Sequence, residues 1–136
     1  MTDLVRPEAK FLLYQTEDGS TRVEVRFDGE AGQIDLIASD ALLFEAERNP
    51  HVVRKRYVFD VMATTGDFVR TDPQLEERAR LLVLAGLKPL DALHLASAEA
   101  GRADFFCTCD DRLLKRARVV AAPPTKAVSP LSSLRR

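Results

Sequence analysis

Residues 86–116, GLKPLDALHLASAEAGRADFFCTCDDRLLKR, decide the fold. Their pattern predicts a helix that begins at Pro89, because proline suits the first helical turn, and that ends at Gly101. Apolar residues recur at helical spacing between these two points. Residues 104–108, DFFCT, form the short apolar run typical of a buried strand, and a basic helix over residues 111–117 follows it.

Two carboxylates stand out in this stretch. Asp91 lies in the first turn of the apolar helix, and Asp110 lies just past the end of the strand. Open α/β sheets bind ligands at the carboxyl ends of their strands, and converging carboxylates suit a hard cation such as Mg²⁺. Each acid also has an ordinary structural interpretation, because the helix dipole favours Asp91 in a first turn and Asp110 is a typical N-cap.

The same stretch resembles the second half of the PIN domain, the nuclease module of VapC-type toxins. The family's Asp-Ala-x-His-x-Ala helix and its strand ending in Thr-x-Asp match Asp91, Ala92, His94 and Ala96, then Thr108 and Asp110. The resemblance reaches back to about Asp35. It implies a PIN-like three-layer α/β fold with a central, mainly parallel sheet, and a divalent-metal-dependent ribonuclease that uses Mg²⁺ or Mn²⁺.

The resemblance also implies a ligand set. In the PIN pattern a Glu follows the Ser of the second strand by six residues, and Glu45 stands in that relation to Ser39. On the residues alone, Glu45 would be a solvated helix acid. The implied set comprises Glu45, Asp91 and Asp110 as catalytic residues and metal ligands, Asp111 as a reserve ligand, and Thr108 and His94 as supporting residues.

The N-terminal third departs from the PIN pattern. Strand-like runs at residues 10–14 and 22–27, with Asp18-Gly19 as a turn signal between them, predict a β-hairpin over residues 10–28. A PIN domain opens instead with a strand that ends in a metal-binding Asp. Asp28 also ends a strand-like run, but it lies too close to Ser39 for the helices that should intervene, and a turn acid is the simpler interpretation.

We therefore expect a hairpin extension over residues 1–33 that replaces the usual first strand, a PIN-like domain over 34–122 and an irregular tail over 123–136. Within the domain, we expect strands at 34–39, 67–70 and 119–122, and helices at 40–48, 51–63 and 73–85. The helix at 51–63 should turn Val52, Val53, Tyr57, Val58, Val61 and Met62 inward. Its cations at 54–56 are a candidate phosphate-contacting patch, although such runs are usually only solvated.

Composition bounds the function classes. The 136 residues, 46% hydrophobic and 30% charged, are enough for one domain with one core. The net charge of −1 means that any RNA contact must come from local cation clusters. The sequence shows neither a long apolar run nor a signal peptide, so we expect a cytoplasmic protein with no membrane span.

Cys107 and Cys109 are too close for an ordinary structural disulfide, and we interpret them as core residues in a reducing compartment.

Three hypotheses remain open. The first is a metal-dependent ribonuclease acting on an RNA substrate, the toxin of a toxin–antitoxin pair with a cognate antitoxin protein and a homodimeric state as implied partners. The second is a catalytically impaired PIN-like remnant that binds protein or RNA, because the acid of the first strand is missing. The third is a gene fusion in which residues 1–33 are foreign to the domain.

Overall fold

The computed structural model describes residues 8–12, 33–48, 50–63, 67–108 and 110–129. In this part of the chain a sheet with the strand order β3-β2-β1-β4-β5 has only parallel pairings. Its strands are β1 (Glu8–Leu12), β2 (Gln33–Ser39), β3 (Asp67–Val69), β4 (Phe105–Cys107) and β5 (Lys126–Val128). The helices are α1 (Asp40–Glu47), α2 (Val52–Met62), α3 (Pro73–Leu84), α4 (Pro89–Ala100) and α5 (Asp111–Val120).

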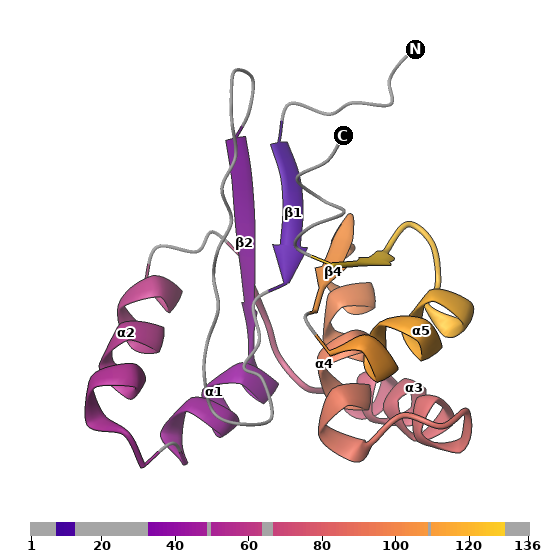
Figure 1. Ribbon diagram of the computed structural model, residues 1–136, viewed down its shortest axis with the longest axis horizontal. Helices are drawn as coiled ribbons and strands as arrows, with labels where there is room; N and C mark the ends of the chain where they lie inside the picture. The colour runs from indigo at the N-terminus through magenta and orange to yellow at the C-terminus, as the bar shows by residue number, and fades with distance from the viewer. Residues whose placement is uncertain (1–7, 13–32, 49, 64–66, 109, 130–136) are drawn as a thin grey trace.

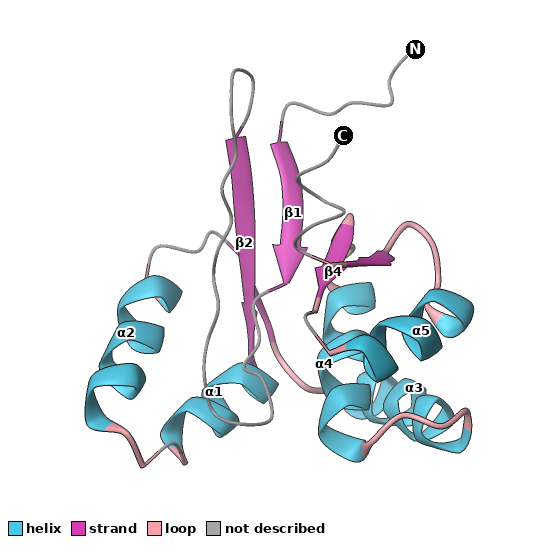
Figure 2. Ribbon diagram, viewed as in Figure 1, coloured by secondary structure: helices cyan, strands magenta, loops and turns pink. Residues whose placement is uncertain are grey.

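Helices lie on both sides of the strands. In Figure 1, α2 lies to the left of β2, α1 lies below the lower end of β2, and α3, α4 and α5 lie to the right; Figure 2 shows the same helices in cyan and the strands in magenta. Parallel strands need crossover connections, which is why helices separate most of them along the chain. The predicted α/β class with a mainly parallel sheet is confirmed.

The first strand pairs differently from our expectation. Leu12 of β1 lies opposite Ile37 of β2 and opposite Phe106 of β4, both in parallel register. Both edges of β1 are therefore paired with other strands. The predicted hairpin between residues 10–14 and 22–27 is wrong for β1. Those residues, and Asp28, lie outside the described part of the chain. The 20 residues that separate Leu12 from Gln33 are long enough for a parallel crossover, which a local turn signal cannot exclude.

Helix α4 forms the centre of the hydrophobic core. It packs against α3 on one side and against β1, β2 and β4 on the other. The small residues Ala92, Ala96 and Ala98 are buried on it, so neighbouring elements approach its backbone closely. Phe106 of β4 and Leu95 of α4 are fully buried, and each such side chain contributes about 1.5–3 kcal/mol of transfer free energy. This packing fixes the position of the N-terminal turn of α4.

The ends of α3 and α4 follow local sequence signals. Asp72 caps α3, and its side chain accepts a hydrogen bond of 2.8 Å from the backbone N–H of Leu75. Pro89 opens α4 and Gly101 ends it, as predicted. Ser39, the last residue of β2, caps α1 through a bond of 3.2 Å from the Leu42 N–H.

Two other expectations need correction. The predicted strand at 119–122 is wrong, because α5 continues to Val120, and the last strand is Lys126–Val128 inside the segment expected to be irregular. The inward position of Val52 and Val53 is also wrong, because both side chains are largely exposed. The side chains of the other four residues expected to face inward lie outside the description. Helical spacing shows which residues share a face, but not whether a neighbouring element covers that face.

Candidate active site

The elements that carry the predicted acids meet at the carboxyl edge of the sheet. Helix α1 begins directly after β2, and Asp110 follows β4 by three residues. Helix α4 ends just before β4 starts, so it runs opposite to the strands and its first turn, with Asp91, lies at their carboxyl ends. In parallel α/β sheets this edge is where ligands bind.

Glu45 and His94 are in direct contact. The Nε2–H of His94 donates to Oε1 of Glu45 across 3.0 Å, which joins α1 to α4. The His94 side chain is only 1% exposed, whereas the Glu45 side chain is 18% exposed and reaches solvent. The buried imidazole fixes the orientation of the Glu45 carboxylate, because it is hydrogen-bonded to one of the two carboxylate oxygens. His94, which we expected to be a supporting residue, thus contacts Glu45, 49 residues away in the sequence.

Asp110 serves as the N-cap of α5. Its Oδ1 accepts hydrogen bonds from the backbone N–H groups of Arg112, at 3.0 Å, and Leu113, at 3.2 Å. Its own N–H donates to Oγ1 of Thr108 at 3.0 Å. Thr108 is buried, and its N–H donates to the Val128 carbonyl of β5. Asp110 is therefore an N-cap, as its structural interpretation predicted. Thr108 stabilises the turn that carries Asp110.

Asp91 and Asp111 occupy the first turns of α4 and α5 respectively. Asp91 is half-buried, and Asp111 is exposed. Both positions are favourable for an acid because the N-terminal end of a helix carries a partial positive charge. The structure thus places each predicted acid at a helix end or within α1, beside the same edge of the sheet.

The predicted ligands are not arranged around a shared divalent ion. Among the described residues, which include all four predicted ligands, no group of three or more His, Cys, Asp or Glu side chains is placed to hold a metal ion together. His94 occupies one oxygen of Glu45, and helix capping occupies one oxygen of Asp110. The donors have the oxygen chemistry that Mg²⁺ prefers, but as placed they do not fit a common ion, and the predicted site set stays a prediction.

Sequence reasoning missed two contacts near this edge. It named Glu45 and His94 separately without pairing them. It also did not foresee that Oδ2 of Asp40 accepts a 2.8 Å hydrogen bond from the Thr71 N–H, which ties the start of α1 to the chain after β3. Neither contact has a local signal, because the partners lie 49 and 31 residues apart. Cys107 is half-buried at the end of β4, and Cys109 lies outside the described residues.

The chain matches a known protein family. The family model of the PIN domain matches residues 13–119. None of the curated proteins matches the chain. Of the helices that the structure describes, none is both long and apolar enough to cross a membrane.

Proposed function

This chain belongs to the PIN domain family, a nuclease superfamily, and we propose that it is a divalent-metal-dependent ribonuclease that hydrolyses phosphodiester bonds in RNA. The family match over residues 13–119 carries the proposal. The placement of Glu45, Asp91 and Asp110 on elements that meet at the carboxyl edge of the sheet supports it. A bound Mg²⁺ or Mn²⁺ would supply an activated water and neutralise phosphate charge.

The residues of this chain have separable parts in the proposal. His94 holds Glu45 in one orientation, and Thr108 holds the turn that presents Asp110. Asp91 lies at the start of α4, whose position the core fixes. Asp111 is exposed beside Asp110 and is the reserve acid. The three main acids are not gathered around a common ion in the described structure, so metal binding would require the side chains of Asp91 and Asp110 to turn toward Glu45.

The resemblance to VapC-type toxins extends the proposal to biology. We propose that the chain acts as the toxin of a toxin–antitoxin pair, with an antitoxin protein as its partner, in the cytoplasm and as a homodimer. Inhibition of RNA cleavage by the product of a neighbouring gene would test this part.

RNA cleavage by the purified chain tests the main proposal. We expect cleavage of single-stranded RNA with Mn²⁺, none with EDTA, and a loss of at least about a hundredfold in Asp91→Asn, because even residues behind metal ligands cost ten- to a hundredfold. The control Glu77→Gln removes an exposed acid from α3 and should cleave normally. Equal cleavage by Asp91→Asn, or cleavage that persists in EDTA, overturns the proposal.

A second candidate is a PIN-like module that binds RNA or protein without cutting. The observation that favours it is the absence of a three-donor group among the described residues. Calorimetry with Mn²⁺ separates the two candidates. The ribonuclease should bind the ion in a manner that Asp91→Asn abolishes, whereas the binding module should show no such divalent binding.

A further inference from the structure

A pocket lies where α5 ends and β5 begins, away from the predicted acids. Its volume is about 430 Å³, within the range of about 300–1,000 Å³ of small-molecule sites. Two lining side chains are cationic, Arg118 and Lys126, and four are apolar, Ala121, Pro123, Pro124 and Ala127. Both cations are exposed to solvent. The pocket therefore joins positive charge to an apolar wall.

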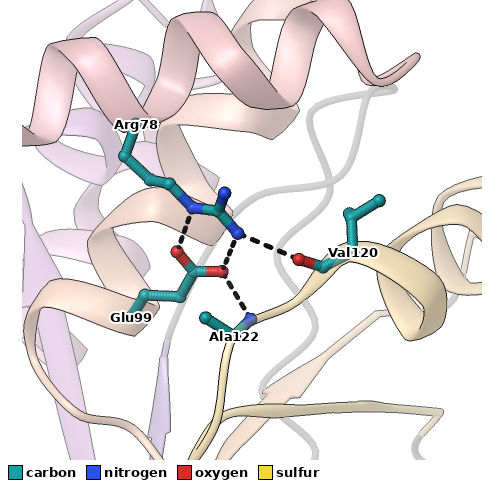
Figure 3. A network of polar contacts seen from close by, with 4 residues as sticks. All are labelled: Arg78, Glu99, Val120 and Ala122. Carbon is teal, nitrogen blue, oxygen red and sulfur yellow. Dashed lines mark hydrogen bonds and ion pairs between the residues drawn. The ribbon is translucent and has the colours of Figure 1, made fainter.

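The turn that forms this pocket is held at both ends. Figure 3 shows that Nη2 of Arg78 donates to the Val120 carbonyl at 2.9 Å, and that the Ala122 N–H donates to Oε2 of Glu99 at 2.9 Å. These two bonds flank Ala121, which lines the pocket. Farther along, the buried Thr125 hydroxyl donates to the Ala103 carbonyl at 2.6 Å. These hydrogen bonds hold the lining residues in place without a ligand. Binding therefore loses less conformational entropy.

Cations continue from the pocket along α5. Arg112, Lys115, Arg116 and Arg118 are all exposed on this helix, and Asp111 is its only acid. The whole chain has a net charge of −1, so this helix concentrates positive charge that the protein does not carry overall. The ten residues of α5 span about 15 Å from the Asp110 end to the pocket. These cations form a track along α5 from the carboxyl edge to the pocket, on both flanks of the helix: Arg116 donates to the Ala85 carbonyl and Arg118 to the Ala127 carbonyl.

We propose that the α5–β5 pocket binds one nucleotide of single-stranded RNA, with its phosphate on Arg118 and Lys126 and its sugar and base against the apolar wall. The cations of α5 then follow the RNA backbone toward the carboxyl edge. A repeating anionic chain fits a track of several cations better than a single small anion does. None of the described residues that line the pocket has an aromatic side chain to stack a base, so recognition is electrostatic and tolerant of sequence.

This inference deepens the proposed function, on which it rests for the choice of RNA. It assigns the substrate a surface about one helix length from the predicted acids. Binding is measured in EDTA, where a metal-dependent nuclease cannot cleave. A failure of cleavage and a failure of pocket binding are therefore distinguishable.

The test is the affinity of the full chain for a fluorescein-labelled oligouridylate of about twelve nucleotides, followed by anisotropy at several salt concentrations. Each lost phosphate contact on single-stranded RNA lowers the salt slope by about 0.7. The double variant Arg118→Gln/Lys126→Gln should lower the slope by about 1.4, which corresponds to about 25-fold weaker binding near 0.1 M salt. Both side chains are exposed, so the variant should melt within a few degrees of the parent chain.

The matched control Arg48→Gln/Arg80→Gln removes the same charge from two exposed positions, the C-cap of α1 and the surface of α3. It should change the affinity less than about threefold. Unchanged binding by the pocket variant, or equal weakening by the control, overturns the proposal.

A second measurement needs no variant. Uridine monophosphate added to the isotopically labelled chain should shift the amide signals of Lys126 and Ala127. Shifts confined to the residues around Asp91 and Asp110 contradict the proposal. Displacement of the labelled RNA by polyglutamate, added at the same concentration of negative charge, would show that the pocket does not prefer nucleic acid to other polyanions. This result also contradicts the proposal.

Discussion

The ion pair between Arg78 of α3 and Glu99 of α4 should contribute measurably to stability. Nε of Arg78 lies 2.7 Å from Oε1 of Glu99, and Nη2 lies 3.1 Å from Oε2 (Figure 3). The Glu99 carboxylate also accepts the Ala122 N–H, so three donors converge on one half-buried group. Its side chain is 11% exposed, whereas that of Arg78 is 34% exposed. The pair joins three helices, because the other Arg78 contact is the Val120 carbonyl at the end of α5.

The magnitude follows from this geometry. Hydrogen bonds to charged groups contribute about 1.5–3 kcal/mol each, but the exposed third of Arg78 allows water to screen the pair. We expect Glu99→Gln to lower the free energy of unfolding by about 2 kcal/mol, because the amide presents one acceptor where the carboxylate presents two. The melting temperature should fall by about 8 °C at this chain length. Arg78→Met should cost a similar amount, because it leaves the Glu99 carboxylate with one of its three donors, the Ala122 N–H.

A double-mutant cycle isolates the pair. Urea unfolding of Arg78→Met, Glu99→Gln and the double variant should give a coupling energy of about 1.5–2.5 kcal/mol. The matched control is the pair Glu77–Arg80 on α3, at 3.5 Å with both side chains more than half exposed. Its coupling energy should stay below about 0.5 kcal/mol. Equal coupling in the two cycles would refute the reasoning, since burial and bidentate geometry are what distinguish them.

The pH dependence provides a further check of the same pair. The hydrogen bond to Glu99 raises the pKa of Arg78 above its ordinary value, although burial opposes the shift. A raised folded-state pKa stabilises the fold at every pH below the ordinary arginine pKa, and the contribution is lost only as the pH rises through the folded value. The destabilisation by Arg78→Met should therefore stay constant between about pH 6 and pH 9. A steep change of this difference within that window would contradict the assignment.

Three other variants test the local structure by thermal melting. Asp110→Ala should lower the free energy of unfolding by about 1 kcal/mol through the lost cap, whereas Asp110→Asn should nearly preserve it; equal losses would deny the capping role. Gly86→Ala should cost about 1 kcal/mol or more, since φ is +115° and a Cβ would lie 2.9 Å from Nη1 of Arg116; an unchanged melting temperature would contradict this. Thr125→Val should cost about 1–2 kcal/mol by removing the buried donor to the Ala103 carbonyl, and a neutral result would show that this bond is dispensable.

Much of the fold was predictable because its signals are local. Pro89 opens α4 and Gly101 closes it, and both behave as the sequence indicated. The caps Ser39 and Asp72 also act within a few residues. The strands before α1 and after α4 were found from short apolar runs. The errors fall where a local pattern allows two outcomes. Val119–Val120 suits a strand by its β-branched residues, but the backbone bond from Ala121 N–H to the Ala117 carbonyl continues the helix.

In the candidate site, too, some features could be predicted from the sequence and others could not. The acids could be named from the sequence through the PIN resemblance, and the chain is a PIN domain protein. Their contacts could not be named. The bond between Glu45 and His94 depends on how α1 and α4 cross the sheet, and the fixed turn around Ala121 depends on α3 meeting the end of α5.

The sequence by itself determined most of the helices and strands and the residues that open and close α4, because these follow from backbone geometry and from neighbours within a few positions. Through the PIN resemblance it also named the acids that we predict as site residues. Only the tertiary structure decided that Glu8–Leu12 lies between β2 and β4, that His94 holds Glu45, and that Arg118 and Lys126 line one pocket. The physical reason is that pairing and packing partners are selected by burial over the whole chain, among many locally equivalent alternatives.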